Sequence, residues 1–303
     1  MADELPSGQL RRFLLESQPL RGHWVHLGAA WQDLRARRAY PPLVEALLGE
    51  AATASVLLAA TLKFEGTLTM QFAGSGRVQL LVAQCTDDFR LRAVATHDVA
   101  YGEAAEFTEL VGTGRLVVTV QSERSSANYQ GIVPLEGGSL AECLERYFAS
   151  SEQLPTRLLL AADGRRAGGM LLQKLPAGSA GGEVAGALLQ SAWEDLQSGL
   201  EALSPELLLA VPAEEAVRRV FGVHDCRLFG PTPVAFACRC NPVRVANLVR
   251  SLGAAEAHAA IAEQGALTVT CEFCGREYAF DAVDIEQLFA GGAALQQGPE
   301  RLN

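Results

Sequence analysis

Two different hydrophobic periods alternate along the first half of the chain. Residues from Leu43 to Lys63 are rich in alanine and leucine, which predicts one long, largely buried helix opened by a pair of prolines. From Gly66 the period changes to two on either side of a Gly-Ser-Gly turn, which predicts a β-hairpin with strands at 67–72 and 78–82. Short apolar or alternating runs predict further strands at 23–27, 89–95, 115–121, 128–134, 158–162 and 170–175.

A second helix is expected from Leu140 to Phe148. Ser139 is a favourable N-cap residue, and the apolar residues that follow it share one helical face. With the strands joined by short turns, residues 1–176 are predicted to form one α+β domain with a mainly antiparallel sheet.

The middle of the chain, residues 177–230, has a different pattern. Its entry at 177–182 consists of Gly, Ala and Ser, which is typical of a flexible linker. A helix is predicted from Glu183 to Leu203, and two short helical pieces should follow Ser204 and Pro212. The long helix has a single apolar stripe, formed by Leu188, Ala192, Leu196, Leu200 and Leu203. With one stripe and no evident core of its own, this segment must pack against a neighbour or stay partly exposed.

The last module, residues 231–303, is predicted to be a small α+β unit. A helix should follow Asn241, and a second should cover Ala254 to Gln264. A β-hairpin and a final helix from about Asp281 complete it.

Composition and charge narrow the possible partners. The chain has 303 residues and a formal net charge of -10, and 49% of its residues are hydrophobic, which is enough for a sizeable core. The net negative charge argues against nucleic acid and against anionic membranes as partners. The N-terminus lacks the pattern of a signal peptide, and the apolar run from Val56 to Leu62 is too short to span a bilayer. A cytoplasmic location is therefore expected.

The strongest chemical signal is a set of four cysteines near the C-terminus. Cys238 and Cys240 form a Cys-x-Cys pair, and Cys271 and Cys274 form a Cys-x-x-Cys pair. In a cytosolic chain, two such pairs predict a metal site before a disulfide framework, and four thiolates suit one tetrahedral zinc ion per chain. The spacing does not distinguish a purely structural zinc site from a redox switch.

The other candidate ligands and thiols are expected to be ordinary. His224 and His258, the nearest imidazoles, are interpreted as surface or satisfied histidines rather than ligands. Cys85 and Cys143 should be buried core residues, and Cys226 a bystander thiol.

Several motifs together resemble a known family. Besides the four cysteines these are Tyr129-Gln130-Gly131-Ile132-Val133 with Leu135-Glu136-Gly137, Ser151-Glu152-Gln153-Leu154-Pro155-Thr156, and Gly168-Gly169-Met170-Leu171-Leu172-Gln173. In this order they resemble the redox-regulated, thirty-three-kilodalton heat-shock chaperones of bacteria, and the resemblance covers essentially the whole chain.

The resemblance implies a function. Members of that family hold zinc and are inactive when reduced. Oxidants convert the zinc thiolates to disulfides, zinc leaves, and the middle segment unfolds. In this chain, proximity along the sequence favours pairing of Cys238 with Cys240 and of Cys271 with Cys274. The exposed surface then binds unfolding proteins without ATP, and the oxidised chain is a homodimer. Leu188, Leu196 and Leu200 are the candidate client-binding residues. Four cysteines allow three connectivities, and Cys226 adds further ones.

Two other functions stay open beside this holdase hypothesis, in which the chain is not an enzyme. A thiol-disulfide oxidoreductase could use Cys271 and Cys274, although a predicted hairpin lacks the helix N-terminus that activates a thiolate. A static zinc-binding interaction module could use all four cysteines. Turnover of a disulfide substrate would favour the former, and activity independent of oxidant the latter.

Overall fold

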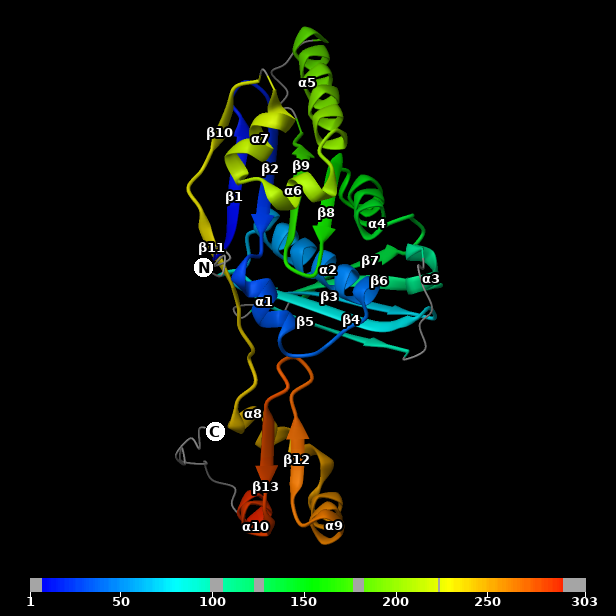
Figure 1. Ribbon diagram of the computed structural model, residues 1–303, viewed down its shortest axis with the longest axis vertical. Helices are drawn as coiled ribbons and strands as arrows, with labels where there is room; N and C mark the ends of the chain where they lie inside the picture. The colour runs from blue at the N-terminus through cyan, green and yellow to red at the C-terminus, as the bar shows by residue number, and fades with distance from the viewer. Residues whose placement is uncertain (1–6, 99–105, 123–127, 177–182, 223, 291–303) are drawn as a thin grey trace. The chain divides into compact units, whose positions relative to one another are not determined.

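The computed structural model describes residues 7–98, 106–122, 128–176, 183–222 and 224–290. By internal contacts the chain divides into two compact units, Met1–Ala237 and Cys238–Asn303 (Figure 1). The predicted flexible entry at 177–182 lies outside the described residues.

The first unit is organised on an eleven-stranded sheet. Its order is β7-β6-β3-β4-β5-β11-β1-β2-β9-β8, and β10 pairs with β1 beside this path. Among the described strands, β5 and β11 form the one parallel pair, so the predicted mainly antiparallel sheet is confirmed. The strands are β1 Gly8–Leu15, β2 Leu20–His26, β3 Gly66–Gly74, β4 Val78–Thr86, β5 Arg90–His97, β6 Gly114–Ser122, β7 Asn128–Pro134, β8 Thr156–Ala162, β9 Ala167–Lys174, β10 Cys226–Leu228 and β11 Thr232–Phe236.

Helix α2, Pro42–Thr61, is the centre of the larger apolar core. It packs against β4, β5, β8 and β9, as the Ala- and Leu-rich sequence predicted. By length and composition α2 could cross a membrane, but 72% of its apolar window is buried inside the protein, which is typical of a core helix. The run from Val56 to Leu62, which by itself is too short to span a bilayer, covers only the end of this helix. The apolar helix as a whole has twenty residues.

The remaining helices of the unit are short, except α5, which has nineteen residues. Ser139 caps α4 as predicted, because its hydroxyl accepts the N–H of Glu142 at 3.1 Å. The helices are α1 Ala29–Arg35, α3 Phe107–Val111, α4 Leu140–Tyr147, α5 Glu183–Glu201, α6 Pro205–Ala210 and α7 Ala213–Phe221, with a π-helical turn η1 at Phe148–Glu152.

Residues that are neighbours in the sequence of a strand belong to two separate apolar clusters, one on each face of the sheet. Val25 and Leu171 join the cluster around α2, whereas their neighbours Trp24 and Met170 join a second cluster with α5, α6 and α7. This alternation follows from the period of two along a strand. Phe13 meets Phe221 edge to face in the second cluster, at 5.1 Å between ring centroids. The middle segment therefore packs on one face of the sheet, which is one of the two outcomes that its single stripe allowed.

The second unit contains the predicted α+β elements. They are α8 Pro242–Leu252, α9 Ala254–Gln264, β12 Leu267–Thr270, β13 Glu277–Phe280 and α10 Ala282–Ala290. Asn241 caps α8 by accepting the N–H of Arg244 at 2.8 Å. The sequence placed the start of this module at 231, but β11 belongs to the large sheet, and contacts divide the chain after Ala237. The functional division into 1–176, 177–230 and 231–303 stays a prediction.

Candidate metal centre

An irregular stretch and a tight turn of the second unit present the four cysteines. Cys238 and Cys240 precede helix α8, and Cys271 and Cys274 lie in the turn between β12 and β13. In that turn the carbonyl of Cys271 accepts N–H groups from both Cys274 and Gly275, at 3.3 and 2.8 Å. Gly275 has a φ of 68°, a left-handed conformation that glycine adopts without steric cost.

The four sulfur atoms converge. They all lie within 4.8 Å of one another, and each cysteine is half-buried. The Cys238 and Cys271 sulfurs are 3.6 Å apart, and the Cys240 and Cys274 sulfurs 3.4 Å. Tetrahedral zinc with Zn–S bonds of ~2.3 Å requires sulfur–sulfur separations of about 3.8 Å. The cluster is therefore close to the dimensions that one zinc ion needs, and its four thiols are the ligands zinc prefers.

The thiols do not have equal acidity. At Cys238 burial opposes ionisation, but the N–H of Cys240 and the surrounding thiols together lower its pKa to about 7. Burial raises the pKa of Cys271, and burial with the neighbouring thiols raises that of Cys274 to about 12. Cys238 is thus the first thiol of these three to ionise, while the Cys-x-x-Cys pair lacks the depressed pKa of an oxidoreductase nucleophile.

The sulfur positions do not select one disulfide pairing. Two of the contacts, Cys238 with Cys271 at 3.6 Å and Cys240 with Cys274 at 3.4 Å, run across the two sequence pairs. Cys238 also interacts with Cys240 and Cys274, so each sulfur has more than one near neighbour. Pairing of Cys238 with Cys240 and of Cys271 with Cys274 stays a prediction.

Comparison with known proteins identifies the family. A family model described as Hsp33 protein matches residues 8–281. A 33 kDa chaperonin of Pseudomonas paraeruginosa is 43% identical over 295 residues, covering 97% of both chains. That of Methylobacillus flagellatus is 40% identical over 284 residues, covering 93% of this chain and 94% of the relative. This chain belongs to the Hsp33 family.

The fold agrees with this assignment. A crystal structure of a 33 kDa chaperonin (heat shock protein 33 homolog) from Thermotoga maritima superposes with a TM-score of 0.81, at 22% identity, and covers 93% of this chain and 98% of its own. The resemblance drawn from the motifs is confirmed. Membership of the Hsp33 family supports a chaperone role, and the relatives are named for a non-enzyme role.

The remaining thiols of this Hsp33-family chain belong to the first unit and are not part of the converging group. Cys85 and Cys143 are buried, as predicted. Cys226 is half-buried in β10, where burial raises its pKa to about 11. A thiol of that pKa is almost fully protonated at neutral pH and reacts slowly with oxidants.

The two histidines named above have carboxylate neighbours. His224 lies 3.0 Å from a carboxylate oxygen of Asp195, which joins α5 to the end of α7. His258 lies 3.9 Å from Glu286 within the second unit. Neither belongs to the group of side chains that converges on the candidate metal position.

The three predicted client-binding leucines differ in exposure. Leu196 and Leu200 are 1% and 5% exposed and lie in the second apolar cluster. Leu188 is 57% exposed on the same helix. Only the first two are therefore concealed by docking of the middle segment, and only they would be uncovered by its release.

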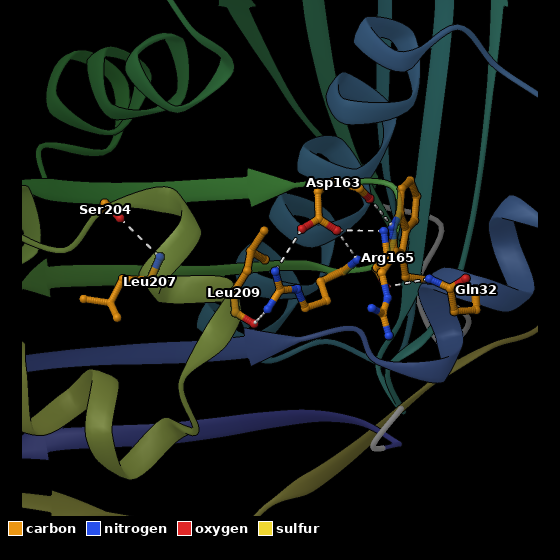
Figure 2. A network of polar contacts seen from close by, with 8 residues as sticks. Gln32, Asp163, Arg165, Ser204, Leu207 and Leu209 are labelled. Carbon is orange, nitrogen blue, oxygen red and sulfur yellow. Dashed lines mark hydrogen bonds and ion pairs between the residues drawn. The ribbon is translucent and has the colours of Figure 1, made fainter. Parts of the chain in front are cut away.

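Sequence reasoning missed a polar network that joins the middle segment to the sheet (Figure 2). At the β8–β9 turn, Asp163 accepts the backbone N–H groups of Arg165 and Arg166 at 2.7 and 2.6 Å. The guanidinium of Arg166 contacts Asp163 at 3.2 Å and donates to the carbonyl of Leu209 at 3.2 Å. Leu209 is near the C-terminal end of α6, where helix carbonyls need partners from outside the helix. The turn residues Asp163-Gly164-Arg165-Arg166 were visible in the sequence, but their partner was not.

Proposed function

We propose that this chain is a redox-regulated, ATP-independent holdase. In the reduced state it holds one zinc ion on Cys238, Cys240, Cys271 and Cys274 and is inactive. Oxidation releases zinc, the second unit and the middle segment unfold, and the exposed apolar surface prevents unfolded proteins from aggregating. The observation that carries the proposal is the convergence of four sulfurs in a unit with a very small apolar core.

The physical basis is the stability that zinc supplies. A unit of this size gains only ~3–5 kcal/mol from its own core. A structural zinc site contributes apparent values of ~10–16 kcal/mol. Loss of the ion is therefore sufficient to unfold the unit.

Peroxide provides a balanced route to that loss. A thiolate attacks one peroxide oxygen and becomes a sulfenic acid, with release of hydroxide. A second thiol displaces the sulfenic oxygen as water and forms the disulfide. Each pair of thiols gives up two electrons to one peroxide molecule as its disulfide forms, and the two disulfides leave no thiolate ligand for zinc.

Release of the middle segment would create the client surface. Leu196 and Leu200 would be uncovered, together with Trp24, Met170 and Leu172 on the strands beneath them. Such an exposed apolar area binds unfolded chains without sequence specificity. Homodimerisation of the oxidised form would add a second surface and raise avidity, and a cytoplasmic location would supply oxidatively damaged clients.

The direct test is an aggregation assay with chemically unfolded luciferase. Oxidised, zinc-free chain should suppress light scattering, whereas reduced, zinc-loaded chain should not. X-ray absorption on the reduced form should give four sulfur ligands, and peptide mapping of the oxidised form should give the Cys238–Cys240 and Cys271–Cys274 pairs. Equal suppression of aggregation by both forms would indicate a static zinc-binding module instead. Turnover of a disulfide substrate would indicate an oxidoreductase.

A further inference from the structure

Strand β11 occupies an unusual place in the large sheet. It lies between β5 and β1, so it joins β7-β6-β3-β4-β5 to β1-β2-β9-β8. Its last residue, Phe236, is separated from the zinc-ligand candidate Cys238 by Ala237 alone. At its other end, β11 directly follows the middle segment, whose last elements are α7 and β10. Both segments that are proposed to unfold on oxidation thus flank this one strand.

Few pairings hold β11 in place. It has five residues, with three register pairs to β1 and two to β5. Pro233 faces Gln9 in the sheet and has no N–H to donate. The bonds toward β5 run from the N–H of Ala235 to Phe89 at 3.2 Å and from that of Ala237 to Leu91 at 2.9 Å. A short strand with a proline has little stability of its own once both flanks are disordered.

The burial of the β11 side chains indicates which residues fit at the strand position between β5 and β1. Val234 is 3% exposed and belongs to the larger apolar core. Phe236 packs against that core, and the Arg37 guanidinium lies 5.4 Å from its ring centroid. Ala235 points outward and is exposed. The position therefore selects an extended segment with apolar residues at alternate positions.

We propose that β11 leaves the sheet when zinc is lost, and that an extended segment of an unfolded client takes its place between β5 and β1. Departure of β11 frees backbone donors and acceptors on both neighbouring strands, together with the apolar space under Val234. An unfolded chain supplies backbone partners and alternate apolar side chains by strand addition. This inference rests on the proposed holdase function and gives it a binding mode different from non-specific contact with the leucine stripe.

The main experiment opens the gap while zinc remains bound. In Val234→Asp a charge replaces a core residue, which should expel β11. Ala235→Asp makes the same change at the exposed neighbour and is the matched control. Both reduced proteins are loaded with zinc and titrated with a fluorescent peptide of residues 232–237. We expect Val234→Asp to bind it and Ala235→Asp not to bind it.

A second peptide separates strand addition from general hydrophobic binding. N-methylation at the positions of Ala235 and Ala237 keeps every side chain and removes the two donors that bond to the carbonyls of Phe89 and Leu91. Its affinity for Val234→Asp should be at least about tenfold weaker than that of the parent peptide. Equal affinities, or identical behaviour of the two variants, would overturn the proposal.

Hydrogen exchange on the wild-type chain provides a test without any variant. The amides of Ala235 and Ala237 should lose protection on oxidation. Segments 8–10 and 89–91 should lose it too and regain it when unfolded luciferase is bound. Persistent protection of β11, or no recovery with client, would refute the inference even if oxidised chain suppresses aggregation. Failure to suppress aggregation at all would instead refute the holdase function.

Discussion

The first unit of the chain packs strands and helices around two large apolar clusters, whereas the second has a cluster of five fully buried residues beside four cysteines. That small cluster is Ala246, Val249, Ala257, Ile285 and Leu288. The second unit also leaves Val243, Leu248, Leu252 and Val283 more than half exposed. The first unit is therefore stabilised by burial of apolar area, whereas the second, on the proposed function, depends on a metal held by its four thiols. An oxidant would act directly on the second unit, and on the first only through the segments that flank it.

The largest effect should come from removing zinc. Chelation from the reduced chain withdraws an apparent ~10–16 kcal/mol from the second unit, so its elements should unfold. Amides of α8, α9 and α10 should lose protection from hydrogen exchange, while those of α2 keep it. If the second unit stays protected from hydrogen exchange without metal, its apolar cluster alone keeps it folded. The two units would then not differ in what stabilises them.

The next effect tests docking of the middle segment. Leu196→Ala removes a 1% exposed side chain from the second cluster and should destabilise docking by ~2–5 kcal/mol. Hydrogen exchange should show opening of α5 in the reduced, zinc-loaded chain, with a gain in aggregation suppression. Leu188→Ala, on the same helix but 57% exposed, is the matched control. Equal effects of the two changes would show that burial against the sheet does not restrain the segment.

Sequence alone predicted the elements that have a local signature. The helix at 42–61, the hairpin of β3 and β4, the Ser139 cap and the four converging cysteines all follow from period, capping chemistry or spacing. Strands β1 and β11 were missed for identifiable reasons. Arg11 and Arg12 interrupt the apolar alternation of β1, and Pro233 hides β11. Both strands are defined by long-range pairing between residues 8–10 and 232–234, which no local pattern records.

A third effect is a pH dependence of stability that arises in the first unit. Burial raises the pKa of Glu50 on α2 to about 7 from the 4.5 of a solvated glutamate. The native state then binds more protons than the unfolded state between these values, so this group's contribution to stability is present below pH 4.5 and is lost as pH rises through 7. The loss should be on the order of 2 kcal/mol, and Glu50→Gln should remove it. Urea denaturation of the zinc-loaded chain at pH 5.5 and 8 measures this. A pH dependence unchanged by the substitution would place its origin elsewhere.

The smallest effect concerns the polar link of Figure 2. Arg166→Gln removes the contacts of the guanidinium with Asp163 and with the Leu209 carbonyl. The Arg166 side chain is 34% exposed, so solvent weakens both contacts, and the middle segment should lose only about 1 kcal/mol. Because Asp163 still accepts the two backbone N–H groups, the turn itself should persist. Exchange of α6 amides should therefore accelerate about fivefold while α2 is unchanged. Arg165→Gln is the control, because Arg165 enters the network through its backbone N–H and carbonyl. If Arg165→Gln accelerated exchange of α6 equally, the positive charge at the turn, and not the bond to Leu209, would hold the segment.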